Sequence, residues 1–187
     1  PRVLEVFSQL DRDHFVPDQY KGLAYADCQL PVVDGESMLP PNVEGRMLQA
    51  LNLQSSDSVL EIGSGCGYLT ACLARLAQQV DSVDLSSEAS DMAAANLAPL
   101  KLANIHLQTI SSLDEINQTE RYDAILVAAG ALPEIPQNLK EALAIGGRLV
   151  VVTGQSPAKH AQLITRVAAD EWSLFNLFET DIADIRY

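Results

Sequence analysis

The stretch that decides the fold is Val59-Leu60-Glu61-Ile62-Gly63-Ser64-Gly65-Cys66-Gly67-Tyr68. An apolar run ends here in three glycines at alternate positions, and an amphipathic segment follows it. Glycine permits positive φ angles and has no Cβ atom, so the backbone can turn sharply and approach a ligand closely. A strand, a glycine-rich turn and a helix in this order are typical of a nucleotide-type binding site at the carboxyl edge of a parallel sheet.

Apolar strands and amphipathic helices alternate from this turn onward. Helices are expected over 69–77, after Ser86 and Ser87, which can cap a helix, and near 137–143. This alternation predicts an α/β fold with a Rossmann-like, doubly wound, mostly parallel sheet and helices on both faces. The expected strands are Ser58–Ile62, 80–85, 104–109, 122–128 and 148–153, the last introduced by Gly146-Gly147.

The two flanks of this core differ from it in pattern. Residues 1–57 are rich in proline and contain the turn pair Asp34-Gly35, and Val43, Met47 and Leu51 share one apolar helical face. We expect an N-terminal helical cap there. Residues 171–185 mix apolar and polar positions without a clean period, which favours antiparallel strands.

Composition and charge narrow the function. The chain has 187 residues, and 12 Lys+Arg against 25 Asp+Glu give a net charge of −13. This charge argues against binding to nucleic acid or to acidic membrane surfaces, and no apolar run approaches the roughly 20 residues of a membrane span. A metal site or a disulfide framework is not expected, because the cysteines and histidines lack ligand spacing; they are Cys28, Cys66, Cys72, His14, His106 and His160.

Two acidic residues flank the glycine turn and suggest the charge of its ligand. The spacing G-x-G-x-G departs from the dinucleotide pattern G-x-G-x-x-G, and Glu61 would repel a pyrophosphate but suit an amine or a cation. Asp84 ends the second predicted strand, where its carboxylate can accept hydrogen bonds from both ribose hydroxyls. Asp84 could instead cap the helix that follows Leu85. Together the two residues favour a positively charged nucleoside cofactor over NAD.

These residues resemble class I S-adenosylmethionine-dependent methyltransferases, in which two acidic residues and a G-x-G-x-G turn hold the cofactor. A narrower resemblance, to the protein-L-isoaspartate O-methyltransferases, covers roughly residues 4–154. It rests on motifs that occur in the family's order: Phe15-Val16-Pro17, Tyr25-Ala26-Asp27, Leu30-Pro31-Val32, Gly35, Pro41, the run 59–71, Tyr122-Asp123-Ala124-Ile125, Pro133-Glu134-Ile135-Pro136 and Gly146-Gly147-Arg148-Leu149-Val150.

The resemblance implies methyl transfer from S-adenosylmethionine to the carboxylate of an isomerised aspartyl residue, which starts protein repair and leaves S-adenosylhomocysteine. It also implies one methyltransferase domain over 1–187, with a cap and substrate-side segment (1–57), a cofactor-binding core (58–154) and C-terminal strands (155–187). The cofactor residues that it implies are Glu61, Gly63, Ser64, Gly65, Gly67, Tyr68, Asp84, Leu85, Ile110, Ser111 and Ala128.

Two positions depart from the family pattern. Leu39 stands where the family carries a serine beside the reacting carboxylate, so Ser37, the nearest hydroxyl, is the candidate catalytic residue. Thr109-Ile110-Ser111 replaces a Gly-Asp-Gly whose aspartate holds the adenine amine. Two alternatives therefore stay open: a methyltransferase of the same fold with another acceptor, or a cofactor-binding protein that has lost isoaspartyl activity.

The partners and the location follow from the same reasoning. The expected partner is a protein or peptide that carries isoaspartate, with no nucleic acid and no membrane, and the sequence does not indicate an oligomeric state. The absence of a secretion signal at Pro1, the unpaired cysteines and the intracellular cofactor predict a cytoplasmic protein.

Overall fold

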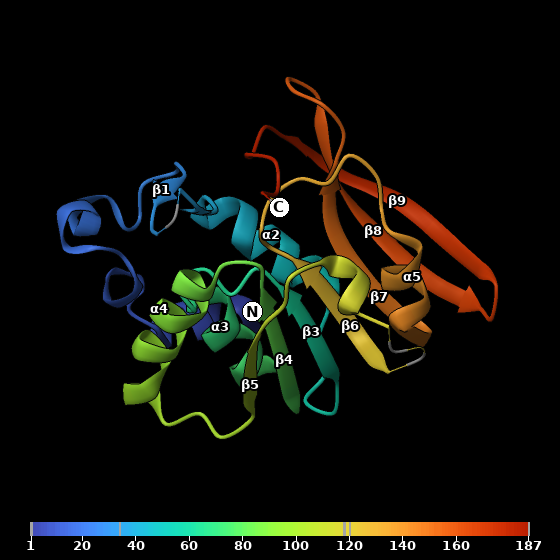
Figure 1. The fold of residues 1–187 in the computed structure, drawn as a ribbon, viewed down its shortest axis with the longest axis horizontal. Coiled ribbons are helices and arrows are strands. Elements are labelled where there is room, and N and C mark those ends of the chain that lie inside the picture. Colours follow the sequence, from blue (N-terminus) through green and yellow to red (C-terminus); the bar gives the residue numbers. More distant parts are fainter. Residues whose placement is uncertain (1, 34, 118, 120, 187) are drawn as a thin grey trace.

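The computed structural model describes residues 2–33, 35–117, 119 and 121–186, and these residues build a seven-stranded sheet (Figure 1). The strand order is β5-β4-β3-β6-β7-β8-β9, parallel from β5 to β7 and antiparallel from β7 to β9. The predicted fold class is confirmed. The strands are β3 (Ser58–Ile62), β4 (Gln79–Asp84), β5 (Ile105–Thr109), β6 (Tyr122–Val127), β7 (Leu143–Thr153), β8 (Lys159–Ala168) and β9 (Glu171–Thr180).

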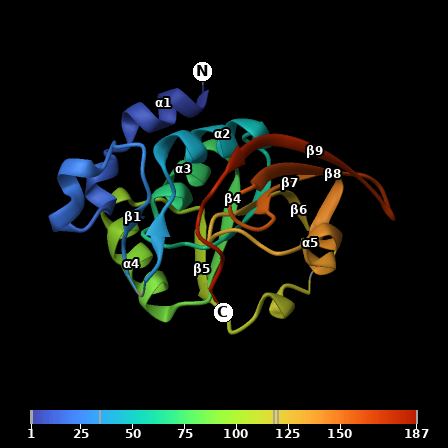
Figure 2. The same cartoon turned by 90° about the horizontal axis from the view of Figure 1, so that it is seen from above.

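Helices precede the sheet and cover it. The predicted N-terminal cap consists of α1 (Arg2–Gln9), two 3₁₀ helices (Arg12–Phe15 and Asp18–Leu23), the paired strands β1 (Leu30–Pro31) and β2 (Ser37–Met38), and α2 (Pro41–Leu51). Figure 2 shows α1, α2 and α3 together above the strands. The remaining helices are α3 (Tyr68–Leu76), α4 (Ser87–Leu97), α5 (Gln137–Ala142) and the 3₁₀ helices Ala98–Leu100 and Leu113–Glu115.

Two apolar clusters hold these helices against opposite faces of the sheet. Side chains alternate between the faces of a strand, so neighbouring residues of β3 enter different clusters. Val59 packs with α1 to α4, whereas Leu60 and Ile62 pack with α5 and the 3₁₀ helix before β6. On β6, Ala124 and Leu126 face the first cluster, and Ile125 and Val127 face the second. Helices therefore cover both faces, as the sequence predicted.

The start of β7 was placed too late by the sequence. The chain passes from α5 directly into the strand, and Leu143 already pairs with Tyr122. The Gly146-Gly147 pair lies inside β7, at an irregularity in its pairing with β6. Gly146 takes a φ of +85° there, and a Cβ atom on Gly147 would lie 2.8 Å from the Ala144 oxygen. The glycines permit this kinked pairing and do not introduce the strand.

The C-terminal segment is only partly the antiparallel structure that was expected over 171–185. The strand β9 pairs antiparallel with β8 and ends at Thr180. The chain then returns toward the loop after β6, where Ala131 and Asp184 form an isolated parallel bridge. This return brings the end of the chain to the carboxyl edge of the sheet.

Among the described residues, no helix is both long enough and apolar enough to cross a bilayer. The expected division of one domain into residues 1–57, 58–154 and 155–187 stays a prediction.

Candidate functional site

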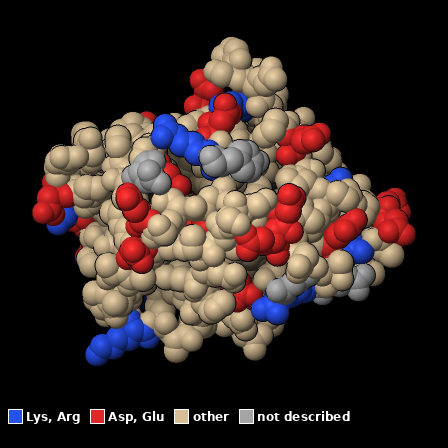
Figure 3. Space-filling view, viewed as in Figure 1, with Lys and Arg blue, Asp and Glu red and all other residues tan. Residues whose placement is uncertain are grey.

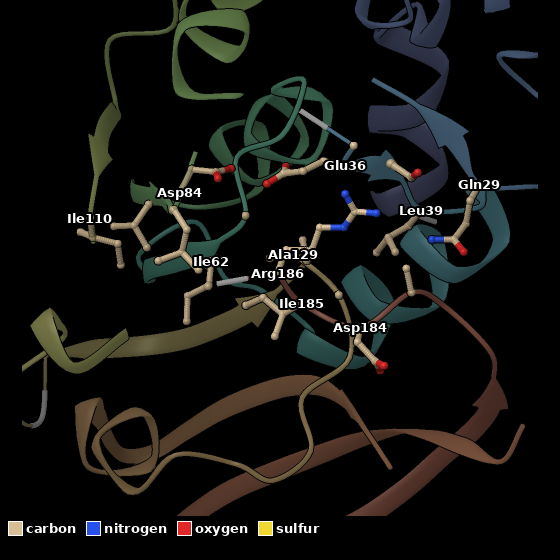
Figure 4. Close-up of a pocket in the computed structure, with 18 residues that line it drawn as sticks. Gln29, Glu36, Leu39, Ile62, Asp84, Ile110, Ala129, Asp184, Ile185 and Arg186 are labelled. Atoms are coloured by element: carbon tan, nitrogen blue, oxygen red, sulfur yellow. The ribbon is translucent and has the colours of Figure 1, made fainter. Parts of the chain in front are cut away.

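A cleft opens at the carboxyl edge of the sheet, where β3, β4 and β6 end (Figure 4). Its volume is about 560 Å³, which includes the space at its open mouth. Strand ends and the glycine turn form one part, here named the turn side: Ile62, Gly63, Val83, Asp84, Leu85, Ile110, Ala128 and Ala129. The N-terminal hairpin and the C-terminal segment form the other part, here named the loop side: Gln29, Gly35, Glu36, Ser37, Leu39, Gly130 and residues 183–186.

The three glycines of the turn have different structural roles. All three have positive φ angles. A Cβ atom on Gly63 would overlap the backbone of Ala129, and one on Gly67 would lie 3.2 Å from Ala93 Cα on α4. A Cβ atom on Gly65 would meet nothing within 4 Å. Packing therefore requires glycine at position 63 and leaves little room beside Gly67, whereas Gly65 leaves open space for a ligand.

Asp84 closes the turn from the end of β4. Its Oδ2 accepts a hydrogen bond of 2.9 Å from the Gly65 N–H, and its Oδ1 accepts one of 3.0 Å from the Ser86 N–H. Each carboxylate oxygen can accept a further hydrogen bond. Ser86 itself caps α4, since its Oγ accepts from the Ala89 N–H. Asp84 thus supports the start of α4 and also lines the cleft.

Glu61 lies beneath the turn and outside the cleft lining. Its Oε2 accepts hydrogen bonds from Thr70 Oγ1 at 2.5 Å and from Ser82 Oγ at 2.6 Å. Its Oε1 is buried with no hydrogen-bond partner among the described residues. Burial raises the pKa of Glu61 to about 8, against the hydrogen bonds from Ser82 and Thr70, which lower it. A buried carboxylate of this kind can gain a cation or a donor.

The far wall of the turn side is apolar. Ile62, Val83, Leu85 and Ile110 line it, and Ile110 follows the end of β5. Such a wall suits the flat face of a heteroaromatic ring. Ser111 does not line the cleft, because it points to solvent and donates to Glu115 Oε1 from both its N–H and its Oγ. The structure thus places Ile110 in the cleft and Ser111 outside it.

A second, smaller hollow adjoins the turn. Ser64, Cys66 and Tyr68 line it together with Gly65 and Ala128. The Ser64 hydroxyl lies 2.8 Å from the Ser82 hydroxyl. Burial raises the pKa of Cys66 to about 12, so its thiol stays protonated and unreactive at neutral pH. Every predicted cofactor residue except Glu61, Gly67 and Ser111 lines one of the two hollows.

Leu39 and Ser37 both face the loop side. Leu39 is 3% exposed. Its carbonyl oxygen accepts a hydrogen bond of 2.7 Å from Arg12, whose guanidinium is buried and also binds Glu44. Ser37 lies on β2, paired with Pro31. A hydroxyl and a fixed leucine side chain therefore border the cleft, with no ionisable base at either position.

The sequence did not identify the remaining residues of the loop side. Gln29 and Glu36 come from the N-terminal hairpin region, and Asp184 and Arg186 come from the C-terminal segment. The turn pair that contains Gly35 was the sole signal for the first group. Nothing in the sequence indicated that residues 183–186 reach the glycine turn.

Comparison with known proteins identifies the family. The family model for protein-L-isoaspartate(D-aspartate) O-methyltransferase matches residues 1–180. The chain belongs to this family. It is therefore an S-adenosylmethionine-dependent methyltransferase, and the enzyme class and the cofactor predicted from the sequence are confirmed.

Relatives within the isoaspartate methyltransferase family match nearly the whole chain. Protein-L-isoaspartate O-methyltransferase 1 of Rhodopseudomonas palustris (strain HaA2) is 37% identical over 188 residues, which cover 100% of this chain and 74% of the relative. The protein-L-isoaspartate O-methyltransferase of Anaeromyxobacter dehalogenans (strain 2CP-C) is 39% identical over 90% of this chain and 81% of its own.

A solved structure of the same family has the same fold. A β-aspartate methyltransferase of Plasmodium falciparum, in complex with S-adenosyl-L-homocysteine, superposes with a TM-score of 0.82 at 20% identity. The superposition covers 99% of this chain and 90% of the other. The likeness extends over the cap, the sheet and the C-terminal strands.

Proposed function

We propose that the chain transfers a methyl group from S-adenosylmethionine to the free carboxylate of an isoaspartyl residue in a protein or peptide. The match of the family model over residues 1–180 carries the proposal. The relatives named above are called protein-L-isoaspartate O-methyltransferases. Location in the cytoplasm stays a prediction from the sequence.

The turn side fits the cofactor. Asp84 offers a carboxylate beside the open space at Gly65, where ribose hydroxyls can donate to it. The apolar wall with Leu85 and Ile110 would face the adenine ring. Glu61 has a buried oxygen without a partner in the described structure, and the ammonium group of the cofactor would favour the ionised form of this side chain through the turn or a bridging water.

Methyl transfer requires little from the protein beyond positioning the acceptor oxygen against the methyl group. The bound cofactor supplies a methyl group on a positively charged sulfur, which is electrophilic without further activation. The acceptor oxygen attacks as a carboxylate and has no proton to lose, so no general base is needed. The new C–O bond forms as the C–S bond breaks, and the electron pair of the C–S bond stays on sulfur. Holding the oxygen in line at near-attack distance is the main contribution left to the chain.

Three residues of the cleft border serve this positioning. Leu39 and Ala128 face both hollows and exclude water from the space between them. Ser37 can donate a hydrogen bond to the acceptor, but its hydroxyl has no proton-transfer role in a reaction that moves no proton. Ser37 is thus proposed as a contact of the acceptor and not as a base.

The test is methyl transfer from radiolabelled S-adenosylmethionine to a peptide that contains isoaspartate. The matched control is the same peptide with a normal aspartyl residue at that position. We expect base-labile methyl ester to form on the isoaspartyl peptide alone. Cofactor binding without transfer to that peptide, or equal transfer to both peptides, would contradict the proposal.

A further inference from the structure

We propose that Arg186 binds the acceptor carboxylate and selects carboxylate over neutral acceptors. This inference deepens the proposed function and rests on it. It would give the loop side the anion contact that Leu39, which has no hydrogen-bonding group, cannot make.

The segment before Arg186 is fixed by backbone hydrogen bonds. The Ala131 N–H donates to the Ala183 oxygen at 2.8 Å, and the Ile185 N–H donates to the Ala131 oxygen at 2.9 Å. Gly130 allows this approach, because a Cβ atom there would lie 2.7 Å from the Ile185 nitrogen. Residues 183–185 are therefore held against the loop that follows β6.

Side chains anchor the same segment. Ile182 and Ile185 are buried in the two apolar clusters. The Lys159 ammonium group, itself buried, donates to the Ile182 oxygen at 2.5 Å and lies 2.8 Å from Asp184 Oδ1. These contacts come from β8 and fix the position from which Arg186 extends.

The Arg186 side chain reaches across the cleft to the N-terminal hairpin. Its guanidinium lies against Gly35, so closely that a Cβ atom on this glycine would overlap it. Figure 4 shows the guanidinium between the segments that carry Glu36 and Leu39. Gly35, with a φ of +71°, gives the guanidinium room at the mouth of the loop side.

Arg186 differs from other arginines of the fold in having no fixed partner among the residues that the structure describes. Arg12 binds Glu44, Arg121 binds Asp81 and Arg148 binds Asp57. Within the described part of the chain, no hydrogen bond or ion pair holds the Arg186 guanidinium. Its five N–H donors are therefore available to a ligand, in a planar arrangement that matches a carboxylate.

The charge around the cleft favours a cationic side chain of this kind as the contact of an anionic acceptor. The protein carries a net charge of −13, and acidic side chains are spread over the face shown in Figure 3. Asp84, Glu36 and Asp184 line the cleft, and among the described lining residues Arg186 is the sole cation. On the loop side, Arg186 would offset the repulsion between these acidic side chains and an acceptor carboxylate.

The experiment compares two peptides at equilibrium with the enzyme saturated by S-adenosylhomocysteine. One peptide contains isoaspartate, and the other contains isoasparagine, in which a carboxamide replaces the free α-carboxylate. Binding is measured by calorimetry for the wild type, Arg186→Gln, Arg186→Lys and the control Arg75→Gln. Arg75 is an exposed arginine on α3 outside the cleft lining. The Kd for S-adenosylhomocysteine and the melting temperature are measured for each variant.

We expect the wild type and Arg75→Gln to bind the isoaspartyl peptide about tenfold or more tightly than the isoasparaginyl peptide, as one charge-assisted contact predicts. Arg186→Gln should bind both peptides equally, and Arg186→Lys should keep part of the preference. The affinity for S-adenosylhomocysteine should be unchanged. In assays of methyl transfer to the isoaspartyl peptide, the weaker peptide binding of Arg186→Gln should appear mainly as a raised KM.

Two contrary outcomes are distinguishable. In the first outcome, the wild-type enzyme methylates the isoaspartyl peptide, and the Arg186→Gln variant keeps the wild-type KM and the full preference for carboxylate. This result would overturn the role of Arg186 but not the proposed function. Wild-type enzyme that binds S-adenosylhomocysteine but neither binds nor methylates the isoaspartyl peptide would overturn the proposed function, and the role of Arg186 with it.

Discussion

The turn side and the loop side of the cleft share a wall but are assembled in different ways. The turn side comes from consecutive strand, turn and strand between Ser58 and Asp84, with Ile110 added from the end of the next strand. The loop side joins the hairpin around Gly35 to the C-terminal segment that carries Arg186. Local sequence therefore specifies the turn side, proposed to hold the cofactor, while tertiary docking specifies the loop side, proposed to hold the acceptor.

This difference has a physical origin. The turn needs glycines and an acidic residue at fixed spacing, because backbone conformation and hydrogen bonding within a short segment set its shape. The loop side depends on Lys159, Gly130 and Ala131, which hold the C-terminal segment from two other elements. Changes on the turn side should affect folding and cofactor binding, and changes on the loop side should affect acceptor binding alone.

The largest expected effect separates two glycines of the same turn. Gly63→Ala should destabilise the protein by several kcal/mol or prevent folding, because the added Cβ atom overlaps the Ala129 backbone at a φ of +99°. Gly65→Ala places its Cβ atom in open space and should lower stability by only about 1 kcal/mol. It should still weaken cofactor binding. Urea unfolding measures the stability of both variants, and calorimetry measures their cofactor binding. Equal stability of the two variants would contradict the different packing of Gly63 and Gly65.

The next effect concerns the carboxylate beneath the turn. The pKa of Glu61 is raised to about 8 in the folded protein, so the folded chain keeps a proton that the unfolded chain releases at lower pH. This contribution to stability is complete below the unfolded pKa of 4.5 and is lost as the pH rises through 8. Its size is about 1.4 kcal/mol for each unit by which the pKa is raised.

Glu61→Gln should remove this pH dependence, because glutamine does not ionise. The free energy of unfolding of the wild type should fall more steeply between about pH 5 and about pH 8 than that of the variant, and the two curves should run parallel above that range. Urea unfolding at several pH values measures the difference. Asp84 and Glu44, the acidic groups that add to the shift, remain in both proteins. Parallel curves for the two proteins would show that Glu61 is ionised throughout.

A smaller effect is expected for the residue proposed to hold the ribose. Asp84→Asn should weaken S-adenosylhomocysteine binding by about tenfold to a hundredfold, since it removes charge-assisted hydrogen bonds. Asp91→Asn, on α4 and outside the cleft lining, is the matched control and should bind normally. Calorimetric titration compares the two. An unchanged Kd for Asp84→Asn would show that the cofactor does not bind at the turn side.

The smallest effect is expected at the loop side. Ser37→Ala should lower kcat for the isoaspartyl peptide by less than about threefold, because a carboxylate acceptor has no proton to give up and a single neutral hydrogen bond contributes little. Its pH–rate profile should match that of the wild type. A loss of about a thousandfold would instead show that Ser37 takes part in the chemical step.

The sequence predicted the turn side closely, and the reason lies in particular residues. Gly63 and Gly65 take the positive φ angles expected of the turn, Asp84 ends β4, and β3 begins and ends as expected. The spacing also indicated the charge of the ligand. Glu61 was assigned to the cofactor contacts, whereas the structure places it below the turn, because its register on β3 directs it toward Thr70 and Ser82.

The loop side could not be predicted because its contacts are not local. Arg186 follows Gly35 by more than a hundred residues. The sequence around Arg186 does not indicate that Ala131 forms hydrogen bonds with the backbone of residues 183 and 185. Ser111, a predicted cofactor contact, lies outside the cleft lining for a related reason: its hydroxyl donates a hydrogen bond to the neighbouring Glu115. Side-chain competition of this kind is decided after the strands are in place.

The most direct test of the whole account is the crystal structure of the enzyme with S-adenosylhomocysteine and an isoaspartyl peptide. The account predicts the ribose hydroxyls on the Asp84 carboxylate, the adenine ring against Ile110, and the peptide α-carboxylate on the Arg186 guanidinium, facing the cofactor sulfur. A cofactor bound elsewhere, or an acceptor carboxylate turned away from both the sulfur and Arg186, would contradict it.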